Sequence, residues 1–562
     1  MIAFSFLFFT SHFKILADLL NMFLGPWWII SGLVLSALGE ASSAKNPSSD
    51  PVALLRRKGI ASDRLNEISL GLKTDDGCFC SLACDTLASI FGGDSVDIVG
   101  QESYETSRSK FWSQQQSQDA RPRCFVHPMD AEDVSVIVLL SRATQCPFAV
   151  KGGGHTPFKG GSNSDGGITI DFGLMKGIIP SADKKSVTIG PGNTWVDVYT
   201  TLEKFNLTMA GGRTATVGVG GLTLGGGISF FSGQYGMTCD NIINFEIVLG
   251  SGEIITVDAN TNADLFWALR GGGGNFGIVT QFVAHAFEQG PIWGGTLGWE
   301  MHSSKVPLID AMISYAEKGS KEDPKGAHIQ SFAYAQTYQM WISATMVHHS
   351  DPQSPGNHPE VFDDILSIEN PFLDTTRSTS HSNHTIEIDA ANPVGLRQSY
   401  WVFATYVDRQ LALDILDIFE EEVNPMRNFT GIIPSLVYQI ITVPQLKAMT
   451  RNGGNALGIG GGKKPLFLVA LTVMWMLKSD DEAVLTAMSN CLSRSQELAR
   501  ERGLDHSFLY MNYASQFQDP IASYGAENRA RLLEVSKKYD PEGVFQSLNP
   551  GHFKLKGPPV RW

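Results

Sequence analysis

Three glycine clusters and one histidine have the types and spacing that point to chemistry. Residues 152–154 are three glycines followed directly by His155, and further clusters occupy residues 218–227 (GVGGLTLGGG) and 271–277 (GGGGNFG). Consecutive glycines let the backbone approach a ligand and turn its N–H groups toward an anion such as a pyrophosphate. A single cluster is typical of a tight turn in a β-rich domain. Three clusters, one of them ending in a nucleophilic imidazole, favour a ligand site.

Two familiar nucleotide sites do not fit these clusters. Neither glycine-rich loop ends in Gly-Lys-Ser/Thr, so the chain has no Walker A motif. A G-x-G-x-x-G match at Gly272, Gly274 and Gly277 follows residues 266–269, which read as helix. Because a Rossmann fingerprint must follow a strand, we do not expect one here.

Composition and charge exclude several classes of protein. The chain has 562 residues with 57 glycines, 43% hydrophobic and 18% charged residues, which excludes a collagen-like or disordered chain. Of the 57 glycines, 28 lie within residues 150–277. The length favours two or three domains. The formal charge of -14, without a local basic stripe, makes nucleic acid an unexpected partner.

The elements around the clusters follow an α/β rhythm. Apolar spacing predicts a helix over residues 130–143 and a strand over 147–151 that runs into the first cluster. A second amphipathic helix is predicted over 195–205, with Asn193 or Thr194 as its cap. The remaining predicted strands are 167–171, 186–189, 242–249, 253–257, 331–338, 341–346 and 466–476. The last predicted helix covers residues 526–538.

The N-terminal segment has features of a targeting signal. Residues 19–39 carry no charge, and Ala37 and Gly39 have the spacing of a signal-peptide cleavage site. The positive region that should precede a signal is poor, because Lys14 is balanced by Asp18. A retained membrane anchor, or a true start at Met22, is the alternative. Three sequons agree with secretory passage: Asn206-Leu-Thr, Asn383-His-Thr and Asn428-Phe-Thr.

Seven cysteines suggest one or two disulfides in an oxidising compartment. Cys124 and Cys146 flank the predicted helix over 130–143, so this pair is favoured. Cys78, Cys80 and Cys84 are a weak zinc candidate because no paired Cys/His group follows at finger spacing. We expect no metal site.

Three segments carry a family resemblance. Residues 148–171 (FAVKGGGHTPFKGGSNSDGGITID), 211–227 (GGRTATVGVGGLTLGGG) and 271–280 (GGGGNFGIVT) resemble the flavin domain of the vanillyl-alcohol-oxidase, or berberine-bridge-enzyme-like, superfamily. Residues 510–513 (YMNY) and 538–545 (KYDPEGVF) are similar to that family's closing segment. The likeness is nearest to FAD-linked oxidoreductases of fungal secondary metabolism.

The resemblance implies an α+β fold: a two-part PCMH-type FAD-binding domain and a substrate domain with an antiparallel sheet and flanking helices. The expected divisions are a signal or anchor (1–44), an N-terminal segment (45–119), the FAD-binding domain (120–290), the substrate domain (291–505) and a C-terminal segment (506–562) that returns to the FAD-binding domain.

The same resemblance assigns cofactor residues. His155 matches the histidine that bonds covalently to the 8α-methyl group of the flavin, and Ile278 matches the position at the adenine end. A pyrophosphate cradle is implied at Gly152, Gly153, Gly154 and Thr156, with Lys151 nearby. Residues implied to face the flavin and its ribityl chain are Thr216, Val217, Gly218, Gly220, Gly221, Gly225 and Gly226.

Two positions depart from relatives of this kind. Doubly linked members carry a cysteine where this chain has Thr214, so a single covalent link through His155 is expected. Plant-like members usually carry a tyrosine where this chain has Phe158, so a plant-type alkaloid ring closure is not implied.

The implied reaction is oxidation of a small molecule, with dioxygen taking the electrons and peroxide formed. By resemblance the base is Tyr510 or Tyr513, with Asn512 beside them, although tyrosines in strands are often core residues. The expected substrate is a hydrophobic alcohol, enol, amine or polyketide-like molecule. The enzyme is expected to be secreted and monomeric. A carbohydrate oxidase, a flavin dehydrogenase and a redox-inactive binding protein are the alternatives. Residues that either line an apolar pocket or fill the core are Trp341, Met346, Trp401, Met474, Trp475 and Met476.

Overall fold

Two sheets in the first half of the chain meet at the glycine clusters. The structure, a computed structural model, describes residues 50–60, 63–70 and 79–560. The first sheet has the order β1-β2-β4-β3 and the second β5-β6-β10-β8-β9. Their strands are β1 (Val96–Ile98), β2 (Cys124–Val126), β3 (Phe148–Lys151), β4 (Ile168–Asp171), β5 (Ile178–Pro180), β6 (Ser186–Ile189), β8 (Ile242–Val248), β9 (Ile254–Asp258) and β10 (Ile278–His285).

A strand-helix-strand unit delivers the first glycine cluster. Helix α5 (Ala131–Thr144) begins where the Asp130 side chain accepts a hydrogen bond from the Asp133 N–H, and it ends at Gln145 in the left-handed conformation. The helix joins β2 to β3, and both strands pair with β4 in parallel. The predicted helix over 130–143 and the strand over 147–151 are therefore confirmed. Strand β3 ends at Lys151, immediately before the glycines.

Helix α6 (Trp195–Glu203) is the second predicted helix, and it begins at the expected cap. Thr194 forms a capping box with Asp197, each satisfying a free N–H of the first turn. Trp195, Val198 and Leu202 are buried on one face of the helix. The first residue of the helix is joined to the loop that carries the second glycine cluster, since the backbone N–H of Trp195 donates to the carbonyl of Val217 at 3.1 Å.

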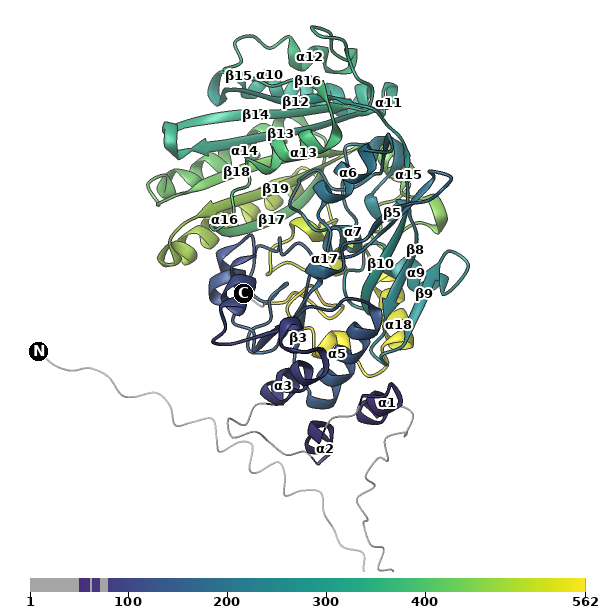
Figure 1. The fold of residues 1–562 in the computed structure, drawn as a ribbon. Helices are drawn as coiled ribbons and strands as arrows, with labels where there is room; N and C mark the ends of the chain where they lie inside the picture. Colours follow the sequence, from purple (N-terminus) through teal and green to yellow (C-terminus); the bar gives the residue numbers. More distant parts are fainter. Residues whose placement is uncertain (1–49, 61–62, 71–78, 561–562) are drawn as a thin grey trace, which may run out of the picture. The chain divides into compact units, whose positions relative to one another are not determined.

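A nine-stranded sheet dominates the second half (Figure 1). Its order is β15-β12-β14-β13-β18-β19-β17-β20, with β16 also paired to β12, and all its pairs are antiparallel. The strands are β12 (Ile292–Glu300), β13 (Gly326–Ala335), β14 (Met340–His349), β15 (Leu373–Asp374), β16 (Arg377–Thr379), β17 (Arg397–Tyr406), β18 (Ile433–Ile441), β19 (Leu466–Trp475) and β20 (Asp505–His506). A separate two-stranded ladder joins β7 (Leu207–Thr208) and β11 (Phe287–Glu288).

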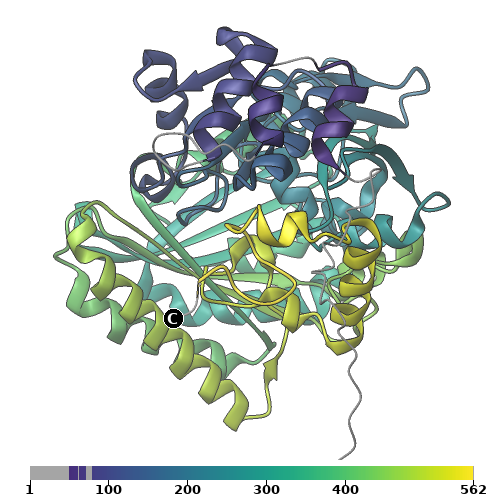
Figure 2. The same cartoon turned by 90° about the horizontal axis from the view of Figure 1, so that it is seen from below.

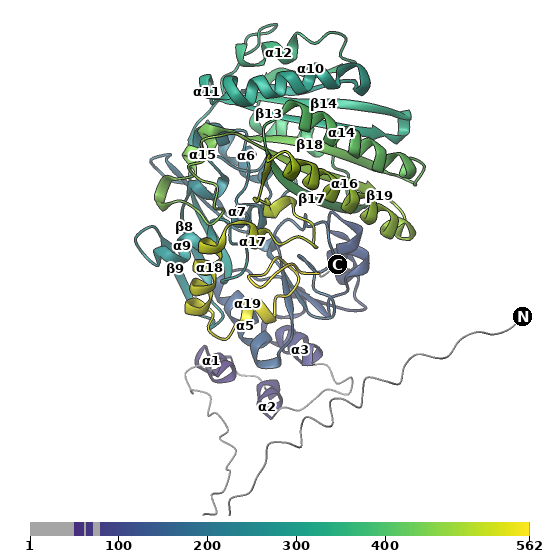
Figure 3. The ribbon, with the colours of Figure 1, turned by 180° about the vertical axis from the view of Figure 1, so that it is seen from behind.

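The large sheet separates two cores. Figure 3 shows the long helices α10 (Met301–Ser314), α14 (Arg409–Val423) and α16 (Asp481–Glu501) across its outer face, and Figure 2 shows the first half of the chain on the other side. On β17, Trp401 and Phe403 belong to the core under these helices, whereas Val402 and Ala404 belong to the core shared with the first half. Successive side chains of a strand point to opposite faces, which explains the alternation.

The C-terminal segment returns to the first half of the chain. Helix α18 (Ala526–Tyr539) packs against α9 (Ala263–Leu269), as Figure 3 shows. The buried carboxylate of Asp540 then accepts hydrogen bonds from the N–H groups of Val544 and Phe545, each at 2.9 Å, and fixes the start of α19 (Val544–Ser547). The remaining longer helices are α1 (Pro51–Arg57), α2 (Asp63–Ser69), α3 (Phe79–Phe91), α4 (Glu102–Ser109), α7 (Val219–Leu224), α13 (His381–Asp389) and α15 (Val443–Ala448).

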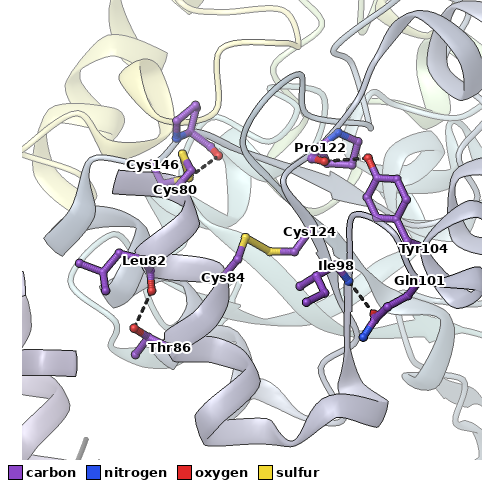
Figure 4. The surroundings of a disulfide bond; sticks show 11 residues. Cys80, Leu82, Cys84, Thr86, Ile98, Gln101, Tyr104, Pro122, Cys124 and Cys146 are labelled. Atoms are coloured by element: carbon purple, nitrogen blue, oxygen red, sulfur yellow. Dashed lines mark hydrogen bonds between the residues drawn. A yellow bond between two sulfur atoms is a disulfide. The ribbon is translucent and has the colours of Figure 1, made fainter. Parts of the chain in front are cut away.

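The disulfides correct the sequence analysis. Cys80 pairs with Cys146 and Cys84 with Cys124 (Figure 4), so the predicted Cys124–Cys146 pair is wrong. Cys124 opens β2 and Cys146 precedes β3, and β4 lies between these strands. Two inter-strand spacings of about 4.8 Å exceed the reach of a disulfide. Helix α3 supplies both partners from positions four residues apart on one face, which leaves neither Cys80 nor Cys84 for zinc. Cys78 lies outside the described residues.

These two disulfides are expected to stabilise the fold. Replacing Cys84 and Cys124 together by serine should lower the free energy of unfolding by about 2–5 kcal/mol, because a crosslink restricts the unfolded chain. Chemical denaturation measures the loss, and a matched Cys80/Cys146 double variant tests the other link. A non-reducing peptide map that joins Cys124 to Cys146 would contradict this assignment.

The predicted signal or anchor, residues 1–44, lies outside the described residues. Among the residues that are described, no helix combines the length and the apolar character needed to cross a membrane. All three sequon asparagines, Asn206, Asn383 and Asn428, are exposed.

Candidate active site

His155 lies against an indole ring that the sequence analysis did not single out. The rings of Trp112 and His155 are stacked, with centroids 4.1 Å apart and planes 14° from parallel. Trp112 is held in place because its backbone N–H donates to the carbonyl of Gly154 and its Nε1–H to that of Asn392, each at 3.2 Å. The orientation of the imidazole is therefore fixed from one face.

The imidazole of His155 is neutral, and its Nε2 has no hydrogen-bond partner among the described residues. This nitrogen is also shielded from solvent. Burial lowers the pKa of His155 to about 4, and the nearby carboxylate of Asp389 opposes this shift only in part. At neutral pH the ring keeps a lone pair that is free to attack an electrophile.

The first two glycine clusters touch each other. A Cβ on Gly153 would overlap the backbone of Gly218, and a Cβ on Gly218 would overlap Gly153. Gly154 has φ +69°, a conformation that favours glycine. The loops that follow β3 and precede α7 therefore form one surface of bare backbone beside His155. This surface and the neutral imidazole fit a histidine-linked FAD.

Alanine at Gly153 is expected to disturb both folding and the cofactor site. The overlap with the Gly218 backbone should lower the free energy of unfolding by about 1–3 kcal/mol, and the flavin content should fall. Gly290→Ala is the matched control, because Gly290 is exposed, lies outside the glycine clusters, and a Cβ there meets nothing within 4 Å. Flavin absorbance per protein and a thermal melt measure the two effects. Unchanged values for both in Gly153→Ala would contradict the contact.

The other predicted cofactor residues occupy varied positions. The ammonium of Lys151 is buried and paired with the carboxylate of Asp171 at 2.8 Å, so its charge is already neutralised. Thr216 donates its N–H and hydroxyl to the Asp389 carboxylate, at 3.2 and 2.6 Å. Ile278 is buried at the start of β10. Thr156 and Val217 are half-buried in the two loops, while Gly220 is half-buried and Gly221 exposed in the first turn of α7.

Gly225 and Gly226 lie against the predicted catalytic segment. A Cβ on Gly225 would overlap the side-chain amide of Asn512, and one on Gly226 would lie 3.4 Å from the ring of Tyr510. Asn512 donates its Nδ2–H to the carbonyl of Leu222 at 3.0 Å. The structure therefore brings together two regions that are separated by nearly 300 residues, as the sequence analysis expected.

Tyr510 and Tyr513 have different surroundings, and they lie around the short helix η11 (Met511–Tyr513) rather than in a strand. Tyr510 is buried, and its oxygen accepts hydrogen bonds from the Gly227 N–H and from Asn512, each at 3.0 Å. Burial raises the pKa of Tyr510 well above its ordinary value, despite these donors. Tyr510 therefore stays protonated at neutral pH.

Tyr513 is half-buried and contacts a cation. The Nη2 of Arg213 donates to the Tyr513 hydroxyl oxygen at 2.8 Å and to Oε1 of Gln439 on β18 at 2.6 Å. A guanidinium that donates to an oxygen stabilises negative charge on that oxygen. Of the two predicted tyrosines, Tyr513 is thus better placed to accept a proton.

A series of aromatic rings connects His155 to these tyrosines. Trp112 packs against Tyr400 with centroids 5.7 Å apart, Tyr400 against Tyr513 at 6.1 Å, and Tyr513 against Tyr510 at 4.9 Å. Tyr400 lies on β17 of the large sheet. Sequence reasoning missed Trp112, Tyr400 and Arg213, because nothing in their local sequence marks them as neighbours.

One face of the large sheet is open to solvent in its middle. The half-buried, uncharged side chains on the face toward the first half of the chain are Ser331, Ile342, Ala344, Met346, Tyr400, Ser435, Val437 and Thr472, which we call the open sheet face. The opposite face is buried under helices and includes Trp341, Trp401 and Trp475. These three tryptophans are therefore core residues, whereas Met346 belongs to the open sheet face.

Comparison with known proteins identifies families and relatives that resemble this chain. The FAD binding domain family matches residues 122–258, and the family described as berberine and berberine like matches residues 509–549. The chain is 38% identical to the FAD-dependent monooxygenase FUP4 of Fusarium proliferatum, over 85% of this chain and 95% of that protein. It is 37% identical to the FAD-dependent monooxygenase tpcD of Cochliobolus heterostrophus, over 85% and 93%.

The chain belongs to the berberine-bridge-enzyme-like family. It contains an FAD-binding domain and is an FAD-dependent oxidoreductase, as the sequence resemblance implied.

Solved structures confirm the expected fold of this berberine-bridge-enzyme-like chain. Glucooligosaccharide oxidase from Acremonium strictum, described with a 6-S-cysteinyl, 8α-N1-histidyl FAD, aligns with a TM-score of 0.66 at 20% identity, over 86% of this chain and 100% of that one. BBE-like 1 of Physcomitrella patens aligns with a TM-score of 0.65 at 20% identity, over 82% and 96%. The α+β architecture with an antiparallel substrate sheet is thus correct.

Proposed function

We propose that this enzyme oxidises a hydrophobic small molecule in fungal secondary metabolism, with FAD linked covalently to His155. The observation that carries the proposal is the ring series that joins His155, through Trp112 and Tyr400, to Tyr513. This series brings His155, Tyr513 and the open sheet face into one region, which supports these roles. Bound FAD would supply the chemistry of hydride acceptance and electron transfer to dioxygen.

The roles of the chain's own residues follow from their surroundings. The neutral imidazole of His155 would anchor the cofactor, and the bare backbone at Gly153 and Gly218 would contact its phosphates without a charged side chain. Thr214 stands where doubly linked relatives carry a cysteine, which supports a single link. Tyr513 would take the substrate's hydroxyl proton while Arg213 stabilises the phenolate.

The more similar relatives give no support to a sugar as the substrate. FUP4 and tpcD are named monooxygenases, while the carbohydrate oxidases among the solved structures are only about 20% identical and bear on the fold alone. The open sheet face has no charged side chain and includes Ala344 and Val437. A flat, largely apolar molecule suits this surface.

Anaerobic titration of the purified protein tests the proposal. A substrate should bleach the visible flavin absorbance, and air should restore it with the release of hydrogen peroxide in equal amount. Labelled dioxygen distinguishes peroxide formation from oxygen insertion into the product. A protein that retains no flavin when produced with excess FAD would refute the proposal. If an artificial electron acceptor restores the flavin absorbance but air does not, the enzyme is a dehydrogenase.

We also propose that the protein passes through the secretory pathway as a monomer. Two disulfides and three exposed sequons support an oxidising, glycosylating compartment. Glycosidase treatment of protein recovered from culture medium, followed by size-exclusion chromatography, tests the compartment and the oligomeric state.

A further inference from the structure

Arg213 is held rigidly where the open sheet face meets the catalytic segment. It follows Gly211 and Gly212, whose bare backbone packs so closely on the indole of Trp195 that a Cβ on either would overlap that ring. Its Nη2 then bridges Tyr513 and Gln439, on opposite sides of the site. Gln439 belongs to the same strand as Ser435 and Val437 of the open sheet face. The guanidinium therefore borders the surface on which a substrate would lie.

The charge of Arg213 has no counter-ion among the described residues. Among the described residues no carboxylate is paired with it, and its two hydrogen-bond partners are the hydroxyl of Tyr513 and an amide. The phenolate that Tyr513 forms as a base would contact Nη2 alone and leave the other nitrogens of Arg213 without an anionic acceptor. The buried Arg397, by contrast, is paired with Asp119 and Asp481. A cation that is taken partly out of water costs free energy unless an opposite charge compensates it. This site therefore favours an anionic ligand.

Arg213 retains donors for such a ligand. A guanidinium has five N–H groups, and the bonds to Tyr513 and Gln439 use only Nη2. Within the described part of the chain no hydrogen bond is recorded for Nε or Nη1. Arg213 is half-buried, so solvent or a ligand can reach it. A planar oxyanion matches the geometry of these remaining donors.

We propose that Arg213 binds a negatively charged oxygen conjugated to the substrate's ring system, either a carboxylate or the ionised oxygen of a phenol or enol. The proposal rests on the proposed function and specifies its substrate: an acidic, largely apolar molecule whose body lies on the open sheet face and whose oxyanion contacts Arg213. A neutral molecule would leave Nε and Nη1 of Arg213 without an anionic acceptor and should bind less well.

Paired probe ligands test the charge requirement. Benzoate and benzamide have nearly the same shape but differ in charge, and calorimetry on the flavin-loaded enzyme measures both affinities. A second pair, 4-cyanophenol above the pH of its ionisation and benzonitrile, distinguishes a phenolate from a carboxylate. We expect each anion to bind at least tenfold more tightly than its neutral counterpart. Equal affinities in both pairs, or no anion binding at tens of millimolar, would overturn the proposal.

Variants assign the preference to Arg213. Arg213→Gln should abolish the preference for anions, Arg213→Lys should retain part of it, and Arg500→Gln should leave it unchanged, because Arg500 is an exposed residue of the outer helix α16. A full anion preference in Arg213→Gln would contradict the assignment. For each variant we also measure the flavin that remains in the acid-precipitated protein. A loss of flavin would mean that the proposed function fails, whereas a loss of anion binding with the flavin retained concerns Arg213 alone. If Arg213→Gln does not fold, the comparison between Arg213→Lys and the wild type decides.

Discussion

Replacing His155 by alanine is expected to release the flavin from the denatured protein. In the wild type, acid precipitation should leave yellow, fluorescent flavin in the pellet, because a covalent bond survives unfolding. In His155→Ala the pellet should lose at least about nine-tenths of that fluorescence, and the flavin should appear in the supernatant. The reason is that His155 supplies a neutral imidazole, whose Nε2 has no partner among the described residues, beside the paired glycine loops.

The variant should still fold and bind FAD reversibly. Alanine removes the partner of Trp112 but leaves the backbone contact between Gly153 and Gly218 intact. Before denaturation, therefore, the variant should retain part of its flavin through gel filtration. His358→Ala is the matched control, since His358 is exposed and contacts only Asp363 among the described residues. Flavin that stays in the pellet of His155→Ala would exclude this residue as the attachment point.

The elements that carry the first glycine cluster were predictable because their signals are local. Three glycines followed by His155 predict a backbone that can approach a ligand, whereas the contact of Gly153 with the Gly218 backbone was not predicted. The strand before this cluster and the helix before that strand follow from periodicity, and both were found. Each of these predictions depends on residues within about twenty positions of one another.

The substrate side of the site was not predictable in the same way. Arg213 and Tyr513 are 300 residues apart, and their contact depends on how the C-terminal segment returns to the first half of the chain. Trp112 meets His155 only because the segment after α13 holds its indole. The disulfide prediction failed for the same reason, since the position of β4 between β2 and β3 is a matter of strand order. Local spacing does not report strand order.

Tyr513→Phe is expected to lower kcat/KM by about 10²–10⁴, the usual contribution of a positioned general base. Tyr513 is the tyrosine that solvent and substrate can reach, and its oxygen already accepts a hydrogen bond from Arg213. The phenylalanine ring keeps the contacts with Tyr400 and Tyr510, so the fold and the flavin content should be preserved. Steady-state kinetics and the flavin spectrum measure both quantities.

Tyr510→Phe distinguishes the two candidate bases, because its expected effect is on stability rather than on rate. Its buried hydroxyl accepts the Gly227 N–H and the Asn512 amide, and the change would leave these donors unpaired at a cost of about 1–3 kcal/mol. Since burial raises the pKa of Tyr510 above its ordinary value, we expect this side chain to stay protonated and kcat/KM to fall less than tenfold. The reverse pattern, a large loss of rate in Tyr510→Phe with little change in Tyr513→Phe, would transfer the proton-accepting role to Tyr510. Such a result would also require a local source of stabilisation for its phenolate that outweighs burial.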